Sequence, residues 1–218
     1  MKNLLTTVAA GMAILLAAAA PICRAGLIYD NLSQASGGSD FVGQGGLVNG
    51  PLYGSFSTGV GAGVRLTGVQ LLLSNGGGSS GITSIGIFNS NNGTSPPSPG
   101  ALYAAIGTVS DSSLSANASV WNVSLVSPLS LAANTRYWVG LSTNNGALTK
   151  WWYASNSAGT GVTGEYFSNS NGTFQNVGNG PYQMSVSVSA VPEPTTSAMA
   201  LAGLAYGCYS LVRHRKRA

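Results

Sequence analysis

Apolar and polar residues alternate most clearly near the end of the central part of the chain, in the stretch YQMSVSVSA. The even positions from Tyr182 to Ala190 are apolar, whereas Gln183 and three serines occupy the positions between them. Successive side chains of a strand point to opposite faces, so this period of two predicts a strand that is buried on one face.

Other short segments rich in β-branched and aromatic residues also predict strands: RLTGVQLLLS, ITSIGIFN, LYAAIGTVS, VWNVSLV and TRYWVGLST. Clusters of Gly, Asn, Ser and Pro such as SNGGGSSG and NSNNGTSPPSPG separate the strands and predict loops. No sustained helical period occurs between the two ends of the chain. The pattern predicts an all-β domain over residues 26–190, with about eight to ten strands in two antiparallel sheets, a jelly-roll-like β-sandwich.

The first 25 residues contain one lysine, an apolar stretch rich in Leu and Ala, Pro21, and a small residue at the end. This order predicts a helical signal peptide over residues 1–25, exported by the Sec translocon and cut by signal peptidase between Ala25 and Gly26. One alternative is a retained membrane helix, although the apolar core is short for a span. Another is a lipoprotein acylated at Cys23, although Ala20-Pro21-Ile22 is a poor preceding motif.

A second apolar segment lies near the C-terminus, where residues 195–212 carry no charge. As a helix this run would span roughly 27 Å, close to the hydrocarbon thickness of a bilayer. It precedes a basic cluster of Arg213, Arg215, Lys216 and Arg217. Because basic residues favour the cytoplasmic side, the pattern predicts a transmembrane helix with the central domain on the other side of the membrane.

Pro192, Glu193 and Pro194 stand directly before this apolar run. The prolines favour an extended backbone and stop strand pairing, which leaves the segment open to a processing enzyme; the alternative is a simple stop before a permanent anchor. VPEP, an apolar span and a basic end together resemble the PEP-CTERM sorting signal. The resemblance covers residues 191–218 and implies recognition at Pro192–Pro194 and cleavage by an exosortase. It also implies a Gram-negative bacterium that makes extracellular polysaccharide.

The central domain also resembles a known family, the choice-of-anchor R domain, over residues 27–167. The segments that carry the likeness are LIYDNLSQ, GSFSTG with RLTGVQLLLSN, SIGIFNSNNG with SPGALYAAIGTVSD, and LAANTRYWVGLST. That family is named for its position upstream of different anchoring signals. Membership implies display at the cell surface and no assigned biochemical activity.

The net charge of +4 belongs to the two ends of the chain. Between residues 26 and 191 there are three basic and four acidic side chains, which gives that region a net charge of −1. A near-neutral domain without a basic stripe argues against a nucleic-acid partner. Both cysteines, Cys23 and Cys208, also lie in the end segments, so the central domain must fold without a disulfide.

The sequence argues against an enzyme. The one histidine, His214, is in the basic tail and the central domain has no cysteine, so neither a serine nor a cysteine triad can form there. A hydrolase that uses paired carboxylates remains an alternative. Its candidates are the four acidic residues of the domain, which the polar context otherwise predicts to be surface charges: Asp30, Asp40, Asp111 and Glu165.

No metal or other cofactor is expected. The domain has no His/Cys pair for zinc and no DxDxDG loop for calcium. Asp30, Asn31 and Asp40 could supply oxygen ligands to a structural calcium ion. The preferred interpretation is that the acidic residues lie in exposed loops and bind no metal.

The segment KWWYAS brings Trp151, Trp152 and Tyr153 together. Exposed Trp and Tyr rings are common platforms for sugars, so these residues are candidate glycan contacts. Neighbouring residues of a strand point to opposite faces, so at most one of the two tryptophans is expected in the core. The alternative is that these rings serve packing alone.

These observations predict an exported, non-catalytic protein of the cell surface or extracellular matrix, which passes through the inner membrane before exosortase releases it. The alternative is a carbohydrate-binding module for the cell's own exopolysaccharide.

Overall fold

The computed structural model describes residues 25–43, 50–60, 63–78, 80–143, 146–177, 180–190, 203–204 and 206–207. The chain divides into two units, one of which is Ala25–Ala190, called the body below. The other unit combines Met1–Arg24 with Val191–Ala218, so most of the signal and sorting segments lie outside the described residues. In that unit, residues 203–204 and 206–207 are helical. None of the described helical residues belongs to a helix long and apolar enough to span a membrane.

The described part of the body contains twelve strands and one short 3-10 helix, η1. Their bounds are β1 Ala25–Asp30, β2 Ser36–Phe41, β3 Leu52–Ser57, β4 Val64–Asn75, β5 Ile82–Asn91, β6 Ser98–Ser110, η1 Asp111–Ser113, β7 Ser119–Leu131, β8 Arg136–Thr143, β9 Thr149–Ala154, β10 Tyr166–Asn169, β11 Gly172–Gln175 and β12 Met184–Ala190.

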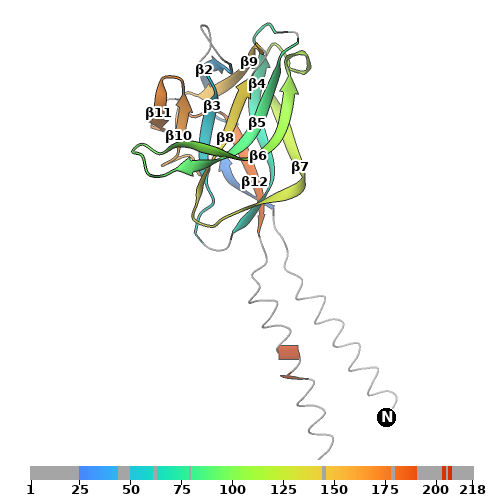
Figure 1. Ribbon diagram of the computed structural model, residues 1–218, viewed down its shortest axis with the longest axis vertical. Helices are drawn as coiled ribbons and strands as arrows, with labels where there is room; N and C mark the ends of the chain where they lie inside the picture. The colour runs from blue at the N-terminus through green and yellow to red at the C-terminus, as the bar shows by residue number, and fades with distance from the viewer. Residues whose placement is uncertain are drawn as a thin grey trace, which may run out of the picture. The chain divides into compact units, whose positions relative to one another are not determined.

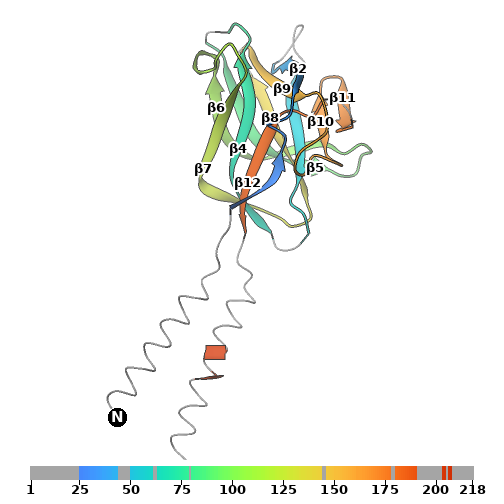
Figure 2. The same cartoon turned by 180° about the vertical axis from the view of Figure 1, so that it is seen from behind.

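The strands form two six-stranded antiparallel sheets. In the first sheet β4 pairs along one edge with β7, and along the other edge with β12 and then β9. β1 flanks β12, and β2 flanks β9. The second sheet has the order β11-β10-β3-β8-β5-β6. Strands of the second sheet are nearer the viewer in Figure 1, and those of the first sheet in Figure 2.

The chain crosses repeatedly between the two sheets. β3, β5, β6, β8, β10 and β11 belong to the second sheet, and the other strands belong to the first. The apolar residues on the inner faces of the two sheets pack together, and the buried side chains form one hydrophobic cluster. The body is therefore an antiparallel two-sheet β-sandwich, as predicted.

All the predicted strand segments are strands, but the number of strands is higher than predicted. β2 (SGGSDF) and the short β10 and β11 lack an apolar alternation that would indicate them. The predicted loop NSNNGTSPPSPG is shorter than expected, because β5 extends to Asn91 and β6 begins at Ser98. Backbone pairing in this long hairpin extends the strands into a polar sequence.

The predicted alternation in β12 holds on its apolar side, where Met184, Val186 and Val188 are buried. On the other side Gln183 and Ser185 are also buried, so the strand is not simply half-exposed. The Gln183 amide donates hydrogen bonds to the backbone carbonyls of Leu32 and Gln34, whose segment covers this position.

Two paired glycines, Gly140 and Gly86, make room for aromatic rings on the outer face of the second sheet. Tyr53 of β3 pairs with Gly140 of β8, which pairs with Gly86 of β5. The Tyr53 and Phe88 rings meet edge to face with their centroids 5.2 Å apart. A Cβ atom on Gly140 would lie 2.5 Å from Phe88 Cε2 and 2.6 Å from Tyr53 Cδ1, so both rings occupy the space that a side chain would need.

Replacing Gly140 with alanine should lower the free energy of unfolding of the body by about 1–3 kcal/mol, because the added methyl group must displace two packed rings. Urea denaturation of the body measures the change. Gly93→Ala is the matched control, because a Cβ atom there would meet one atom at an ordinary 3.6 Å. Equal stability of the two variants would contradict this account of the paired glycines.

Candidate functional site

Trp151 lies in the core and does not present its ring for glycan contact. Its side chain is 0% exposed and stacks on the ring of Tyr182, with the centroids 4.7 Å apart and the planes at 19°. Its indole N–H donates to the carbonyl of Gln183 at 3.0 Å. Alternation along β9 places this side chain between the two sheets. Trp151 therefore serves packing, which was the alternative to glycan contact.

Trp152 points to the opposite, outer face of the first sheet and is partly exposed. Its indole N–H donates to the hydroxyl of Ser74 at 2.9 Å, which holds the ring in place. Lys150 lies on the same face, with its ammonium nitrogen 4.7 Å from the centroid of the Phe41 ring. Of the two tryptophans, therefore, one is in the core and one is at the surface, as alternation predicts.

Tyr153, the third candidate, lines a cleft of about 480 Å³. Lining residues come from β2, from β9 with the residue after it, from β10 and from the segment before β12: Gly37, Asp40, Tyr153, Ala154, Ser155, Phe167 and Gly180. β2 and β10 lie at the same side of the sandwich in both views (Figures 1 and 2). The cleft is therefore the place where the interior between the two sheets opens at an edge.

Glycines shape this cleft. A Cβ atom on Gly37 would lie 3.0 Å from Tyr153 Cε2, and one on Gly180 would lie 2.6 Å from Phe167 Cζ. Gly180 also has a φ of +106°, a conformation that side chains disfavour. The two aromatic rings can rest against the backbone only because these positions have no side chain.

Asp40 places a carboxylate at a position that faces the interior. It is paired with Trp151 across β2 and β9, so its side chain shares the inner face with that tryptophan. The hydroxyl of Tyr182 donates to Asp40 Oδ2 at 2.7 Å. Burial, followed by the hydrogen bond to Asp40, raises the pKa of Tyr182 well above its usual value, so the phenol keeps its proton and remains a donor.

Sequence analysis did not associate Asp40 with Tyr153 or with Phe167. A signal was present in SGGSDF, where two glycines stand close to an acidic residue. The segment has no apolar alternation to mark it as a strand, and without a strand the sequence assigns no face to Asp40.

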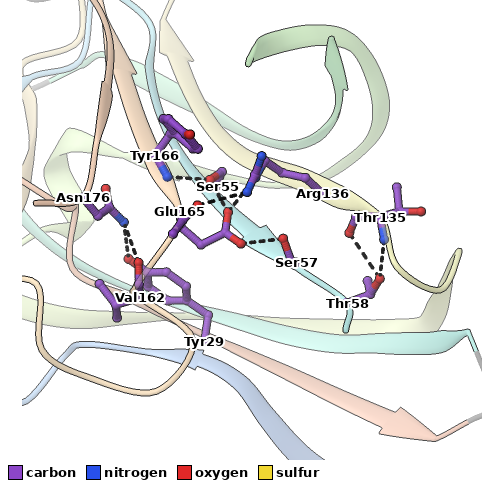
Figure 3. A network of polar contacts seen from close by, with 11 residues as sticks. Tyr29, Ser55, Ser57, Thr58, Thr135, Arg136, Val162, Glu165, Tyr166 and Asn176 are labelled. Carbon is purple, nitrogen blue, oxygen red and sulfur yellow. Dashed lines mark hydrogen bonds and ion pairs between the residues drawn. The ribbon is translucent and has the colours of Figure 1, made fainter. Parts of the chain in front are cut away.

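Glu165 is not the surface charge that was expected, because its side chain is only 5% exposed. Its carboxylate accepts hydrogen bonds from the hydroxyls of Ser55 and Ser57, and from Arg136 Nε at 2.9 Å (Figure 3). Arg136 also donates to the carbonyl of Gly164 at 3.0 Å. These bonds satisfy a buried charge and fix the segment before β10 to strands β3 and β8.

Asp111 is also fully buried, which corrects the same expectation. Its two carboxylate oxygens accept the Thr149 hydroxyl at 2.9 Å and the Leu148 amide at 2.8 Å. The side chain of Asn75 donates to the Asp111 backbone carbonyl at 2.9 Å. Asp111 therefore ties together the ends of β4 and β6 and the start of β9, a structural role.

The three residues considered as calcium ligands each accept a hydrogen bond within the protein. Asp30 accepts the amide of Leu32, Asn31 is fully buried and accepts the amide of Met184, and Asp40 accepts the hydroxyl of Tyr182. Within the described ranges, no three His, Cys, Asp or Glu residues group together as metal ligands.

The predicted processing residues lie in the other unit or at its border. Pro192, Glu193, Pro194 and the basic cluster of Arg213, Arg215, Lys216 and Arg217 are outside the described residues. Of the predicted signal peptidase site, Ala25 and Gly26 are the first residues of β1.

Comparison with known proteins gives no match, either to a family model or to a curated protein.

Two buried tyrosines, Tyr29 and Tyr182, predict that the stability of the body falls at alkaline pH. Burial raises the folded-state pKa of Tyr29 and Tyr182 above the unfolded value of about 10, so their contribution to stability is present below that pH and declines above it. The free energy of unfolding should therefore fall above about pH 10, by up to roughly 1.4 kcal/mol per pH unit for each tyrosine. Tyr182→Phe should show a shallower decline, measured by urea denaturation at several pH values. Equal slopes for the wild type and the variant would contradict the assignment.

Proposed function

We propose that this chain is an exported, non-catalytic protein of the cell surface or extracellular matrix of a Gram-negative bacterium. A PEP-CTERM signal directs it, and an exosortase cleaves that signal after the Sec translocon and signal peptidase have acted at the N-terminus. The membrane holds the chain through the C-terminal apolar run until this cleavage.

The order of features at the C-terminus carries this proposal. Pro192–Pro194, the uncharged run of residues 195–212 and four basic residues follow each other without interruption by an acidic side chain. The apolar length suits a bilayer, and the basic cluster favours the cytoplasmic side. These physical requirements of an anchored and cleavable tail are met together in one segment.

The end of the body's last strand, β12, is compatible with processing at the C-terminal end. Ala25 of β1 pairs with Ser189 of β12, so the two places where processing segments join the body are neighbours in one sheet. Pro192 lies two residues beyond Ala190, the last residue of β12, where proline cannot continue the ladder. At the C-terminal end, we therefore expect exosortase to act on a segment that does not continue the sheet.

We also propose a finer description of the fold, a jelly roll with four added strands. With β2, β9, β10 and β11 set aside, the remaining eight strands form sheets of order β1-β12-β4-β7 and β3-β8-β5-β6. Counted along the chain these orders are 1-8-3-6 and 2-7-4-5, the arrangement of two interlocked Greek keys.

Replacing Pro192, Glu193 and Pro194 together with alanine should stop exosortase processing and leave the chain in the inner membrane with Ala218 intact. Mass spectrometry of the C-terminus after cell fractionation measures the result. The wild-type protein should end within a few residues of Pro192–Pro194. An intact Ala218 in wild-type protein from the cell surface would indicate a permanent tail anchor and overturn the sorting proposal.

Binding of the cell's exopolysaccharide is a second candidate function. The cleft at Tyr153 favours it, because two aromatic rings, a carboxylate and a serine hydroxyl meet there in a concave site. Small-molecule sites combine apolar walls with a few fixed polar groups in this way. The ring of Trp152, on the outer face of the first sheet, is a second possible binding surface for the same kind of ligand.

Pull-down of the protein with the exopolysaccharide of its own cell distinguishes the cleft from the Trp152 ring as the binding site. If the cleft binds the polymer, Tyr153→Ala should weaken retention by about tenfold, the loss of one stacking contact, whereas Trp152→Ala should leave it unchanged. The reverse result would assign binding to the outer face of the first sheet. Failure of the wild-type protein to bind the polymer would remove the second candidate and leave the sorting proposal standing.

A further inference from the structure

The charge of the cleft indicates which class of sugar it can accept. Among the described residues that line it, Asp40 is the one acidic residue and none is basic. Arg136 is engaged by Glu165, and Lys150 lies over the Phe41 ring on the outer face of the sheet. Arg65, the remaining basic residue of the body, belongs to β4, which contributes nothing to the cleft wall. The carboxylate therefore faces a ligand without a compensating cation in the wall.

The Asp40 carboxylate is held in a fixed orientation. Among the described residues, its side chain receives a single hydrogen bond, from Tyr182 to Oδ2. Tyr182 is itself 1% exposed and is confined between the stacked ring of Trp151 and the edge-on ring of Phe167, whose centroid is 5.9 Å away. Because Tyr182 occupies only one oxygen, the carboxylate retains capacity to accept hydrogen bonds from a ligand.

The walls suit a ring that has both an apolar face and hydroxyl groups. Tyr153 and Phe167 supply aromatic surface, and Ser155 adds an exposed hydroxyl at the rim. A pyranose presents C–H groups to such rings, and its hydroxyls donate to a carboxylate in charge-assisted hydrogen bonds. A uronic acid would bring its own negative charge against Asp40, and like charges at such distances repel.

We infer that the cleft between β2, β9 and β10 binds uncharged or amine-bearing pyranose units and discriminates against uronates, with Asp40 as the residue that determines this specificity. The inference rests on the second candidate function and is independent of how the chain is sorted. It makes Asp40 a ligand-binding residue.

The cleft also lies far from the chain ends within the body. β9 and β2 join the first sheet beside Leu73–Asn75 at one end of β4, whereas Val64 at the other end of β4 pairs with Ala190. Figure 1 shows β2 and β9 at the opposite end of the sandwich from the point where β12 ends. Ala190, where the C-terminal segment leaves the body, is therefore at the opposite end of β4 from the cleft.

The test uses mature protein recovered from the cell surface and three immobilised polymers: a neutral glucan, a polymer of glucosamine and a polymer of galacturonic acid. We expect the wild-type protein to bind at least one of the first two about tenfold or more tightly than the third. Asp40→Asn keeps an acceptor for the Tyr182 hydroxyl. It should weaken binding of the preferred polymer about tenfold and reduce the difference in affinity between that polymer and the galacturonate polymer. Asp30→Asn is the matched control, because it removes the same charge from a residue that does not line the cleft.

A second variant keeps the inference testable if Asp40→Asn does not fold. Ser155→Arg places a cation at the exposed rim without altering the buried residues, and should raise binding of the galacturonate polymer relative to the glucan. Equal binding of all three polymers by the wild-type protein would overturn the inference. The inference would also be wrong if neither variant changed the ratio of binding between the galacturonate polymer and the other two. Absence of binding to every polymer would overturn it together with the second candidate function, while the C-terminus found by mass spectrometry would still decide the sorting proposal.

Discussion

Burial of the inner faces of two sheets against each other is the constraint on which this structure depends. The body has no cysteine, so no disulfide can compensate for a poorly filled interior. Fully buried side chains from both sheets, among them Trp151 and Leu71 from the first and Phe56 and Leu141 from the second, supply that interior. Where the apolar filling ends, at the edge formed by β2 and β10, the space between the sheets becomes a cleft lined by glycines, two rings and Asp40.

The same constraint explains why two acidic residues are buried. Glu165 and Asp111 each occupy a position where a connecting segment must be fixed against strand ends, and each accepts several hydrogen bonds there. Glu165 is balanced by Arg136, while Asp111 is held by an amide and a hydroxyl. Polar side chains thus provide local attachment in a protein whose sheets are held together by apolar contact.

Sequence alone predicted the elements whose pattern is local. The alternation from Tyr182 to Ala190 and the apolar segments of β4, β5, β6, β7 and β8 mark strands because each buries one face along its own length. The sequence also predicted that Trp151 and Trp152 point to opposite faces. It could not predict β2, whose residues Gly37 and Gly38 have no side chain to show a face, nor the burial of Glu165, whose partners Ser55 and Ser57 are more than 100 residues away. The cleft depends on such distant pairings, so only one of its rings, Tyr153, was anticipated.

The position of β12 has a mechanical consequence. This strand is paired on one side with β1 and on the other with β4 along most of its length. Tension applied at Ala190 along β12 would act across the hydrogen bonds to β1 and β4, which lie perpendicular to the strand. Those bonds would share the load in shear instead of opening one after another, a geometry that resists extraction of the strand.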